Sequence, residues 1–131
     1  MQILFVEDDA MNRRVVKDML SVVGASMDEA ENAETGLQMI EDGTYNIVLM
    51  DLRMPGMDGL TAIRKIRSRP DAKARLPVIV VTADTAIDLR TRCLDDGADD
   101  VILKPVAMGM LLKSISCLVA KSAKANGLVV N

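Results

Sequence analysis

Short runs of consecutive apolar residues recur along the chain, and a polar or charged residue follows each run at once. Because apolar and polar positions do not alternate within these runs, they are typical of strands that helices cover on both faces of a parallel sheet. We predict such strands at four places: residues 3–6, 47–50, 78–81 and 101–103. A further, less apolar strand is expected over residues 26–30.

Segments with the apolar spacing of amphipathic helices separate the predicted strands. They span residues 12–23, 33–41, 58–67, 86–96 and 106–121. Gly24 and Gly97 follow the first and the fourth of these segments and are typical helix stop signals. Strands and helices therefore alternate along most of the chain, which predicts a doubly wound α/β domain.

Length, composition and charge narrow the class of protein. The chain has 131 residues, half of them apolar, which suits one domain that folds without a disulfide or a structural metal. Its net charge of -3 and its scattered basic residues argue against a nucleic-acid-binding surface. It contains no histidine, so it cannot carry a phosphohistidine of its own. Without a membrane-spanning run or a signal-peptide pattern, a soluble cytoplasmic protein is expected.

The polar residues that follow the strands carry the candidate chemistry. In doubly wound sheets, ligands bind outside the carboxyl ends of the strands, where the strand order reverses. We therefore expect one pocket lined by residues from the predicted strand ends: Glu7, Asp8, Asp51, Thr82 and Lys104. Three close carboxylates repel one another unless a cation joins them, and Mg²⁺ binds such oxygen ligands together with phosphate oxygens. A carboxylate can also accept a phosphoryl group, which an ammonium and a hydroxyl would help to position.

Four motifs at these strand ends resemble the signature blocks of two-component receiver domains, in the same order and near the same spacing. They are Glu7-Asp8, the stretch from Met50 to Gly59, Val81-Thr82-Ala83 and Lys104-Pro105. The resemblance covers residues 2–121 and implies a five-stranded parallel sheet in the flavodoxin-like order 2-1-3-4-5, with five helices on its two faces. It also implies a receiver domain over residues 1–121, with residues 122–131 as a short C-terminal tail and no output domain.

The resemblance implies a role for each residue of the pocket. Asp51 is the expected phospho-acceptor, and the side chains of Thr82 and Lys104 are expected to contact the phosphoryl group. In relatives the peptide bond between Lys104 and Pro105 is cis. The implied cofactor is Mg²⁺, with Mn²⁺ as a substitute. Its expected ligands are Glu7 (largely through water), Asp8, Asp51 and the backbone carbonyl of Arg53.

Three further positions are expected to modulate the site. Val101 stands where most receivers carry an aromatic residue that rotates when the threonine moves, so this coupling is expected to be absent or muted. Arg53 and Asp84 lie at positions that influence the lifetime of the phosphoryl group. An ion pair between them would obstruct an attacking water; an exposed pair with little effect is the alternative. Asp9 extends the acidic run at a position that varies in the family, and is expected to be a bystander.

These features predict a phospho-accepting receiver of a two-component phosphorelay, as in bacterial-type signalling. A partner phosphohistidine would transfer its phosphoryl group to Asp51 in a Mg²⁺-dependent step, and protein–protein contacts would pass on the signal. No enzymatic activity is expected beyond this autocatalytic acceptance and slow self-dephosphorylation. The implied partner is a histidine kinase or a histidine phosphotransfer protein, bound at the first helix. Neither nucleic acid nor a membrane is expected as a partner, and the resemblance implies a homodimer through the last strand and the last two helices.

Three alternatives remain open. The chain could be the receiver module of a hybrid histidine kinase rather than a stand-alone regulator, because Asn12 and the stretch Thr82-Ala83-Asp84 look more like such modules. A degenerate receiver would bind partners without accepting phosphate. A phosphohydrolase with an aspartate nucleophile has a similar arrangement but places a second aspartate two residues after the nucleophile, where this chain has Arg53.

Overall fold

Five parallel strands form one sheet in the computed structural model, which describes residues 1–125. The strands are β1 (Gln2–Val6), β2 (Ser26–Ala30), β3 (Ile47–Met50), β4 (Val78–Thr82) and β5 (Asp100–Leu103). Their order across the sheet is β2-β1-β3-β4-β5, and each neighbouring pair is parallel. The predicted doubly wound fold and its strand order are therefore confirmed.

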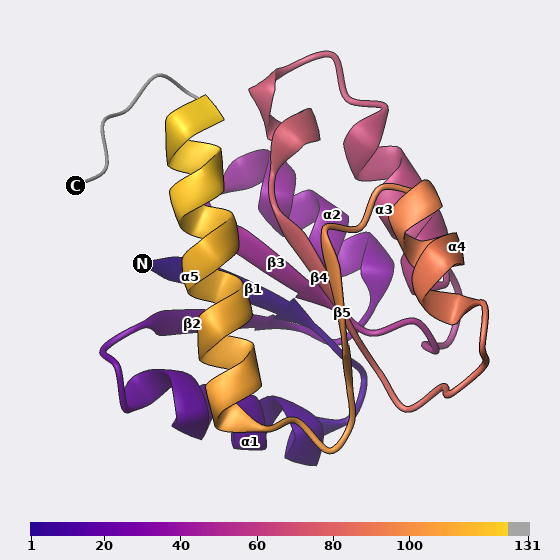
Figure 1. Cartoon of the computed structure of the whole chain (residues 1–131). Coiled ribbons are helices and arrows are strands. Elements are labelled where there is room, and N and C mark those ends of the chain that lie inside the picture. Colours follow the sequence, from indigo (N-terminus) through magenta and orange to yellow (C-terminus); the bar gives the residue numbers. More distant parts are fainter. Residues whose placement is uncertain (126–131) are drawn as a thin grey trace.

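Helices cover both faces of this sheet (Figure 1). They are α1 (Ala10–Ser21), α2 (Ala33–Asp42), α3 (Gly59–Arg67), α4 (Leu89–Asp95) and α5 (Met108–Ala125), and a 3₁₀ helix, η1 (Ala72–Arg75), precedes β4. On one face, α1 and α5 pack with Phe5 and Leu49; on the other, α2, α3 and α4 pack with Leu4 and Val48. Both faces of the strands are thus buried, which explains their continuous apolar runs. None of the helices in the described part of the chain combines the length and the apolar character that crossing a membrane requires.

Helix α1 begins at Ala10, before its predicted start at residue 12, because the side chain of Asp9 caps it. Asp9 Oδ1 accepts hydrogen bonds from the backbone N–H groups of Met11 (2.8 Å) and Asn12 (3.1 Å). The helix ends at Ser21, and Gly24 follows in a left-handed conformation with a φ of 74°. Asp9 therefore stabilises the start of this helix.

The last two helices differ most from their predicted bounds. Helix α4 begins at Leu89 rather than at residue 86, because the Asp84 side chain accepts a hydrogen bond from the Ala86 N–H (2.9 Å) and holds these residues in a turn. Helix α5 begins at Met108 and continues past its predicted end at residue 121 to Ala125, through alanine and lysine residues that favour helix. Residues 126–131 of the predicted tail lie outside the part of the chain that the structure describes.

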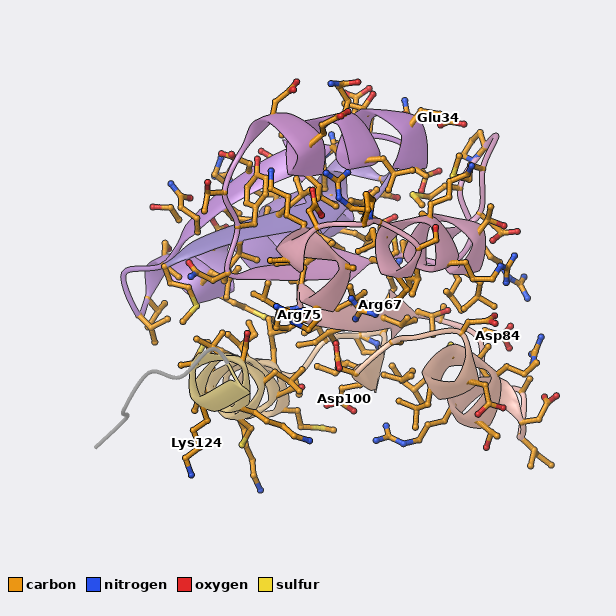
Figure 2. The ribbon with its side chains drawn as sticks, turned by 90° about the horizontal axis from the view of Figure 1, so that it is seen from above. Glu34, Arg67, Arg75, Asp84, Asp100 and Lys124 are labelled. Carbon is orange, nitrogen blue, oxygen red and sulfur yellow. The ribbon has the colours of Figure 1, made fainter. Side chains whose placement is uncertain are left out.

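Arg67, at the end of α3, joins segments that are distant in sequence (Figure 2). Its guanidinium donates hydrogen bonds to the carbonyl oxygens of Ala74 (2.9 Å), Leu76 (2.7 Å) and Gly97 (2.8 Å) and pairs with Asp99 (2.9 Å). The Asp99 carboxylate also accepts a hydrogen bond from the Val78 N–H (2.8 Å), at the start of β4. One arginine thus connects α3, η1 and the segments that lead into β4 and β5.

Candidate functional site

The carboxyl ends of β1, β3, β4 and β5 lie at one edge of the sheet and form a cleft. Glu7 and Asp8 follow β1, Asp51 follows β3, Thr82 ends β4 and Lys104 follows β5. The structure brings these five residues together in the lining of one cleft, because parallel strands present their carboxyl ends at the same edge. The side chains that the sequence singled out as modulators, Arg53 and Asp84, line it as well.

Three carboxylates in this cleft lie close enough to share a cation. One oxygen each from Glu7, Asp8 and Asp51 lies within 4.8 Å of the other two. Glu7 and Asp51 are buried, with 1% and 5% of their surface exposed, whereas Asp8 is exposed. Oxygen donors of this kind suit Mg²⁺, which takes few protein ligands and keeps several waters. The donor set therefore fits the predicted divalent cation, and the exposure of Asp8 leaves the position accessible to water and phosphate oxygens.

Burial and mutual repulsion make ionisation of these acids less favourable. Burial is the main cause that raises the pKa of Glu7, and the nearby Asp51 raises it further, against the opposing effect of Lys104. Desolvation at the cleft, followed by the proximity of Glu7, also raises the pKa of Asp8, although much of its side chain is exposed. Carboxylates that repel one another in this way are stabilised strongly by a bound cation.

Lys104 supplies a positive charge inside the cleft. Its ammonium nitrogen lies 2.5 Å from Glu7 Oε1 and 3.5 Å from Asp51 Oδ1. The backbone N–H of Lys104 donates to the Thr82 carbonyl (2.8 Å), which extends the pairing of β5 with β4 and positions the lysine. Partial burial acts to lower the pKa of Lys104, but Glu7 and Asp51 outweigh it and raise this pKa, so the ammonium stays charged. The peptide bond between Lys104 and Pro105 is cis.

A hydroxyl and an ion pair complete the lining of the cleft. Thr82 is buried, and its Oγ1 accepts a hydrogen bond from the backbone N–H of Asp84 (3.1 Å). The Asp84 carboxylate, on the loop before α4 (Figure 2), pairs with Arg53 at 3.2 Å. The hydrogen bond from the Ala86 N–H, followed by Arg53, holds the pKa of Asp84 below its usual range. Arg53 and Asp84 thus join the loop after the acceptor to the loop after β4, with the Arg53 side chain 82% exposed.

Val101 does not line the cleft. It is half-buried, lies beside Val80 of β4 and packs against the layer formed by α2, α3 and α4. The chain contains two aromatic residues, Phe5 and Tyr45, and neither of them lines the cleft. No aromatic ring is therefore placed beside Thr82 to follow its movement.

The loop after Asp51 needs glycine at two positions. Gly56 adopts a φ of 84°, a left-handed conformation that residues with a side chain disfavour. Gly59 begins α3, and a Cβ atom there would lie 2.2 Å from the carbonyl oxygen of Asp51. The start of α3 therefore packs directly on the backbone of Asp51, and the Asp58 side chain caps this helix by accepting from the Thr61 N–H (2.8 Å).

Three further polar residues line the cleft that were not predicted as site residues, and one of them is Asp9, which was expected to be a bystander. Asn12 lies in the first turn of α1, and Thr85 lies on the loop after β4. Neither follows a strand directly, so the pattern of apolar runs carries no signal for them. The sequence also did not predict a contact between the loop after Asp51 and α2. Glu34 accepts a hydrogen bond from the backbone N–H of Met57 (3.3 Å).

Comparison with known proteins agrees with this geometry. Residues 3–116 match the family model of the response regulator receiver domain. Sensor histidine kinase RcsC of Salmonella typhimurium is 34% identical over 116 residues, which are 88% of this chain and 12% of that protein. Response regulator MprA of Mycobacterium sp. (strain KMS) is 34% identical over 126 residues, which are 96% of this chain and 54% of that protein. The chain thus spans about half the length of one relative and about an eighth of the other.

A solved structure with a similar fold is the receiver domain of sensor histidine kinase PA1611 from Pseudomonas aeruginosa PAO1. Its TM-score with this chain is 0.82 at 30% identity, over 91% of this chain and 97% of that one. That crystal structure holds a magnesium ion coordinated in the active site cleft. The chain belongs to the response regulator receiver domain family. It is therefore a phospho-accepting receiver of two-component signalling, a class of domain that generally accepts phosphoryl groups rather than acting as an enzyme.

Proposed function

We propose that this receiver accepts a phosphoryl group from a partner phosphohistidine on the carboxylate of Asp51, in a step that needs Mg²⁺, and relays a signal through protein–protein contacts. The placement of Asp51 carries the proposal. Its buried carboxylate directly follows β3 and lies close to the acids Glu7 and Asp8 and to the ammonium of Lys104. A carboxylate nucleophile with a cation site and an ammonium beside it has the groups that phosphoryl acceptance requires.

Transfer would begin with attack of an Asp51 oxygen on phosphorus. The P–N bond of the phosphohistidine breaks as the new O–P bond forms, and the imidazole nitrogen keeps the bonding electrons and takes up a proton. The ammonium of Lys104 would move from Glu7 to a phosphoryl oxygen, and the Thr82 hydroxyl would donate to another. Mg²⁺ held by Glu7, Asp8, Asp51 and the backbone carbonyl of Arg53 would supply neutralisation of the phosphoryl charge.

Incubation of the full chain with Mg²⁺ and acetyl phosphate, followed by intact mass measurement, tests the assignment. We expect one phosphoryl adduct on the wild-type protein and none on Asp51→Asn, because the amide retains the shape of the side chain but is not a nucleophile. Chelation of Mg²⁺ should also prevent the adduct. Asp42→Asn is the matched control, since Asp42 is exposed at the end of α2 and does not line the cleft, and it should form the adduct. An adduct on Asp51→Asn would overturn the assignment, whereas no adduct on the wild-type protein would support a binding-only receiver.

We further propose that the ion pair of Arg53 and Asp84 lengthens the lifetime of the phosphorylated state by obstructing an attacking water. Arg53→Ala should speed dephosphorylation about two- to fivefold, the modest effect that an exposed ion pair can have. Decay of the adduct after removal of the phosphodonor measures this rate. Arg69→Ala breaks a pair with Asp71 outside the cleft and should leave the rate unchanged. Equal rates in Arg53→Ala and the wild-type protein would exclude this role.

A receiver module of a hybrid histidine kinase is the second candidate. RcsC and PA1611 are sensor histidine kinases, which favours a module of this kind, whereas MprA is a response regulator. The full reading frame of the gene distinguishes the two candidates. A kinase domain in the same frame supports the module, and a frame without one supports the stand-alone regulator.

We propose two protein-binding surfaces for the relay. The histidine kinase or phosphotransfer partner would dock on α1 beside the cleft, where Met11 and Val15 are exposed. A second copy of the chain would dock on α4, β5 and α5, where Leu94, Leu103 and Met110 are exposed. Large apolar patches with a polar rim are typical of surfaces that bind other proteins, and these exposed side chains would contribute to such patches.

A further inference from the structure

Arg13 is a buried arginine on α1, behind the acidic end of β1. Only 8% of its surface is exposed. Its Nη1 donates a hydrogen bond to the backbone carbonyl of Glu7 (2.7 Å), and its Nε donates to Glu29 Oε1 (3.0 Å). Its Nη2 lies 3.9 Å from Glu31 Oε1. Because a buried guanidinium is costly unless partners satisfy it, these contacts define its position closely.

The contact with Arg13 holds the peptide group that links Glu7 to Asp8. Strand β1 ends at Val6, and the Glu7 N–H still donates to the Ala30 carbonyl of β2 (2.9 Å). The Glu7 carbonyl is the acceptor that Arg13 satisfies. Because a peptide group is planar, a carbonyl oxygen held in place also sets the direction of the next N–H and Cα. Arg13 therefore sets the point from which the Asp8 side chain leaves the backbone.

Glu29 anchors the guanidinium from β2. One of its carboxylate oxygens accepts from Arg13, and the other accepts from the Lys17 ammonium at 3.3 Å. Burial acts to raise the pKa of Glu29, but the hydrogen bonds from Arg13 and Lys17 outweigh it and lower this pKa. The carboxylate thus stays ionised at neutral pH, and its charge offsets that of the buried guanidinium, whereas a different nitrogen of Arg13 contacts Glu7.

We propose that Arg13 is a positioning residue for the divalent-cation site, which acts through the Glu7 carbonyl to place the carboxylates of Glu7 and Asp8 for metal binding. The inference rests on the cation site proposed above. Arg13 contacts neither the cation position nor the phosphoryl group, so it is not a catalytic residue. Loss of a group that orients a metal ligand without binding the metal itself typically weakens metal binding by about 10- to 100-fold.

Binding of Mn²⁺ to the full, unphosphorylated chain, followed by the EPR signal of the free ion, tests this role without any phosphoryl transfer. Arg13→Met should weaken Mn²⁺ binding about tenfold or more, because methionine fills much of the space but cannot donate to the Glu7 carbonyl. Arg13→Lys retains a donor and should recover part of the affinity. Arg14→Met is the matched control, since Arg14 is exposed and its one ion pair within residues 1–125 is with Asp18 on its own helix, and the affinity of this variant should equal that of the wild-type protein.

Glu29→Gln separates positioning from stability. It removes the charge that anchors Arg13 and should lower the free energy of unfolding, but it leaves the contact of Arg13 with Glu7 and should retain Mn²⁺ affinity. Wild-type affinity in folded Arg13→Met would overturn the inference. If Arg13→Met does not fold, Arg13→Lys must bind Mn²⁺ more weakly than Glu29→Gln, and equal or reversed affinities would overturn it. A wild-type chain that binds no Mn²⁺ would overturn the cation site itself.

Discussion

Lys104→Met should slow phosphoryl acceptance at Asp51 by about 10²- to 10³-fold, the loss typical of removing one preorganised donor from a charge-stabilising site. The ammonium lies 3.5 Å from Asp51 and 2.5 Å from Glu7, so it is positioned to meet a phosphoryl oxygen on the acceptor. Methionine has a similar length but no charge. Because Lys104 acts to lower the pKa of Glu7, its loss should raise this pKa further.

The rate of adduct formation with acetyl phosphate at saturating Mg²⁺ measures this effect. Lys113→Met, on the exposed side of α5, is the matched control and should react at the wild-type rate. Urea unfolding of both variants shows whether they remain folded. A folded Lys104→Met protein that accepts phosphate at the wild-type rate would contradict the role assigned to the ammonium.

Arg67→Met should lower the free energy of unfolding by about 2–4 kcal/mol. The change removes the donor for three backbone carbonyls and leaves the Asp99 carboxylate without its arginine partner. Asp99 in turn holds the first residue of β4, Val78, so the loss extends to the start of that strand. Since 23% of the arginine side chain is exposed, water replaces some of the lost contacts and keeps the effect below that of a fully buried ion pair.

Urea titration at constant pH measures this change as a shift of the unfolding midpoint. Arg69→Met is the matched control, because the Arg69 side chain is equally exposed, at 23%, but in the described part of the chain its one partner is Asp71. Its midpoint should shift far less. Equal shifts in the two variants would show that the contacts of Arg67 with the backbone carbonyls add little to stability.

The sheet and its cleft could be predicted because burial on both faces leaves a clear trace in the sequence. The run at residues 47–50 is apolar throughout, since both of its faces lie under helices. In a parallel sheet, any residue that follows such a run lies at the same edge as its counterparts. Glu7, Asp51 and Lys104 could therefore be expected in one pocket, although they are far apart in sequence.

Contacts from long basic side chains to backbone carbonyls could not be predicted in this way. Like Arg13 and Arg67, Lys73 of η1 makes contacts with backbone carbonyls that the sequence does not predict. Its ammonium donates to the carbonyl oxygens at the end of α2, those of Ile40 (2.8 Å), Glu41 (2.8 Å) and Gly43 (3.0 Å). Every residue carries a backbone carbonyl, so no residue type marks such an acceptor in the sequence. The predicted start of α4 at residue 86 was wrong for a related reason. The Asp84 side chain accepts a hydrogen bond from the backbone N–H of Ala86 and competes locally with helical hydrogen bonds.

Among the strands that the structure describes, β5 lies at the edge of the sheet, with β4 as its one neighbour. The carboxylates of the cleft follow β1 and β3, which have a strand on each side, whereas the ammonium of Lys104 follows β5. Edge segments with fewer contacts open locally more often than central ones. Each opening of β5 would withdraw the ammonium while the acids stay together, and would make an already acidic cleft more strongly anionic. Fraying of this strand and the affinity of the cleft for a divalent cation are therefore thermodynamically linked.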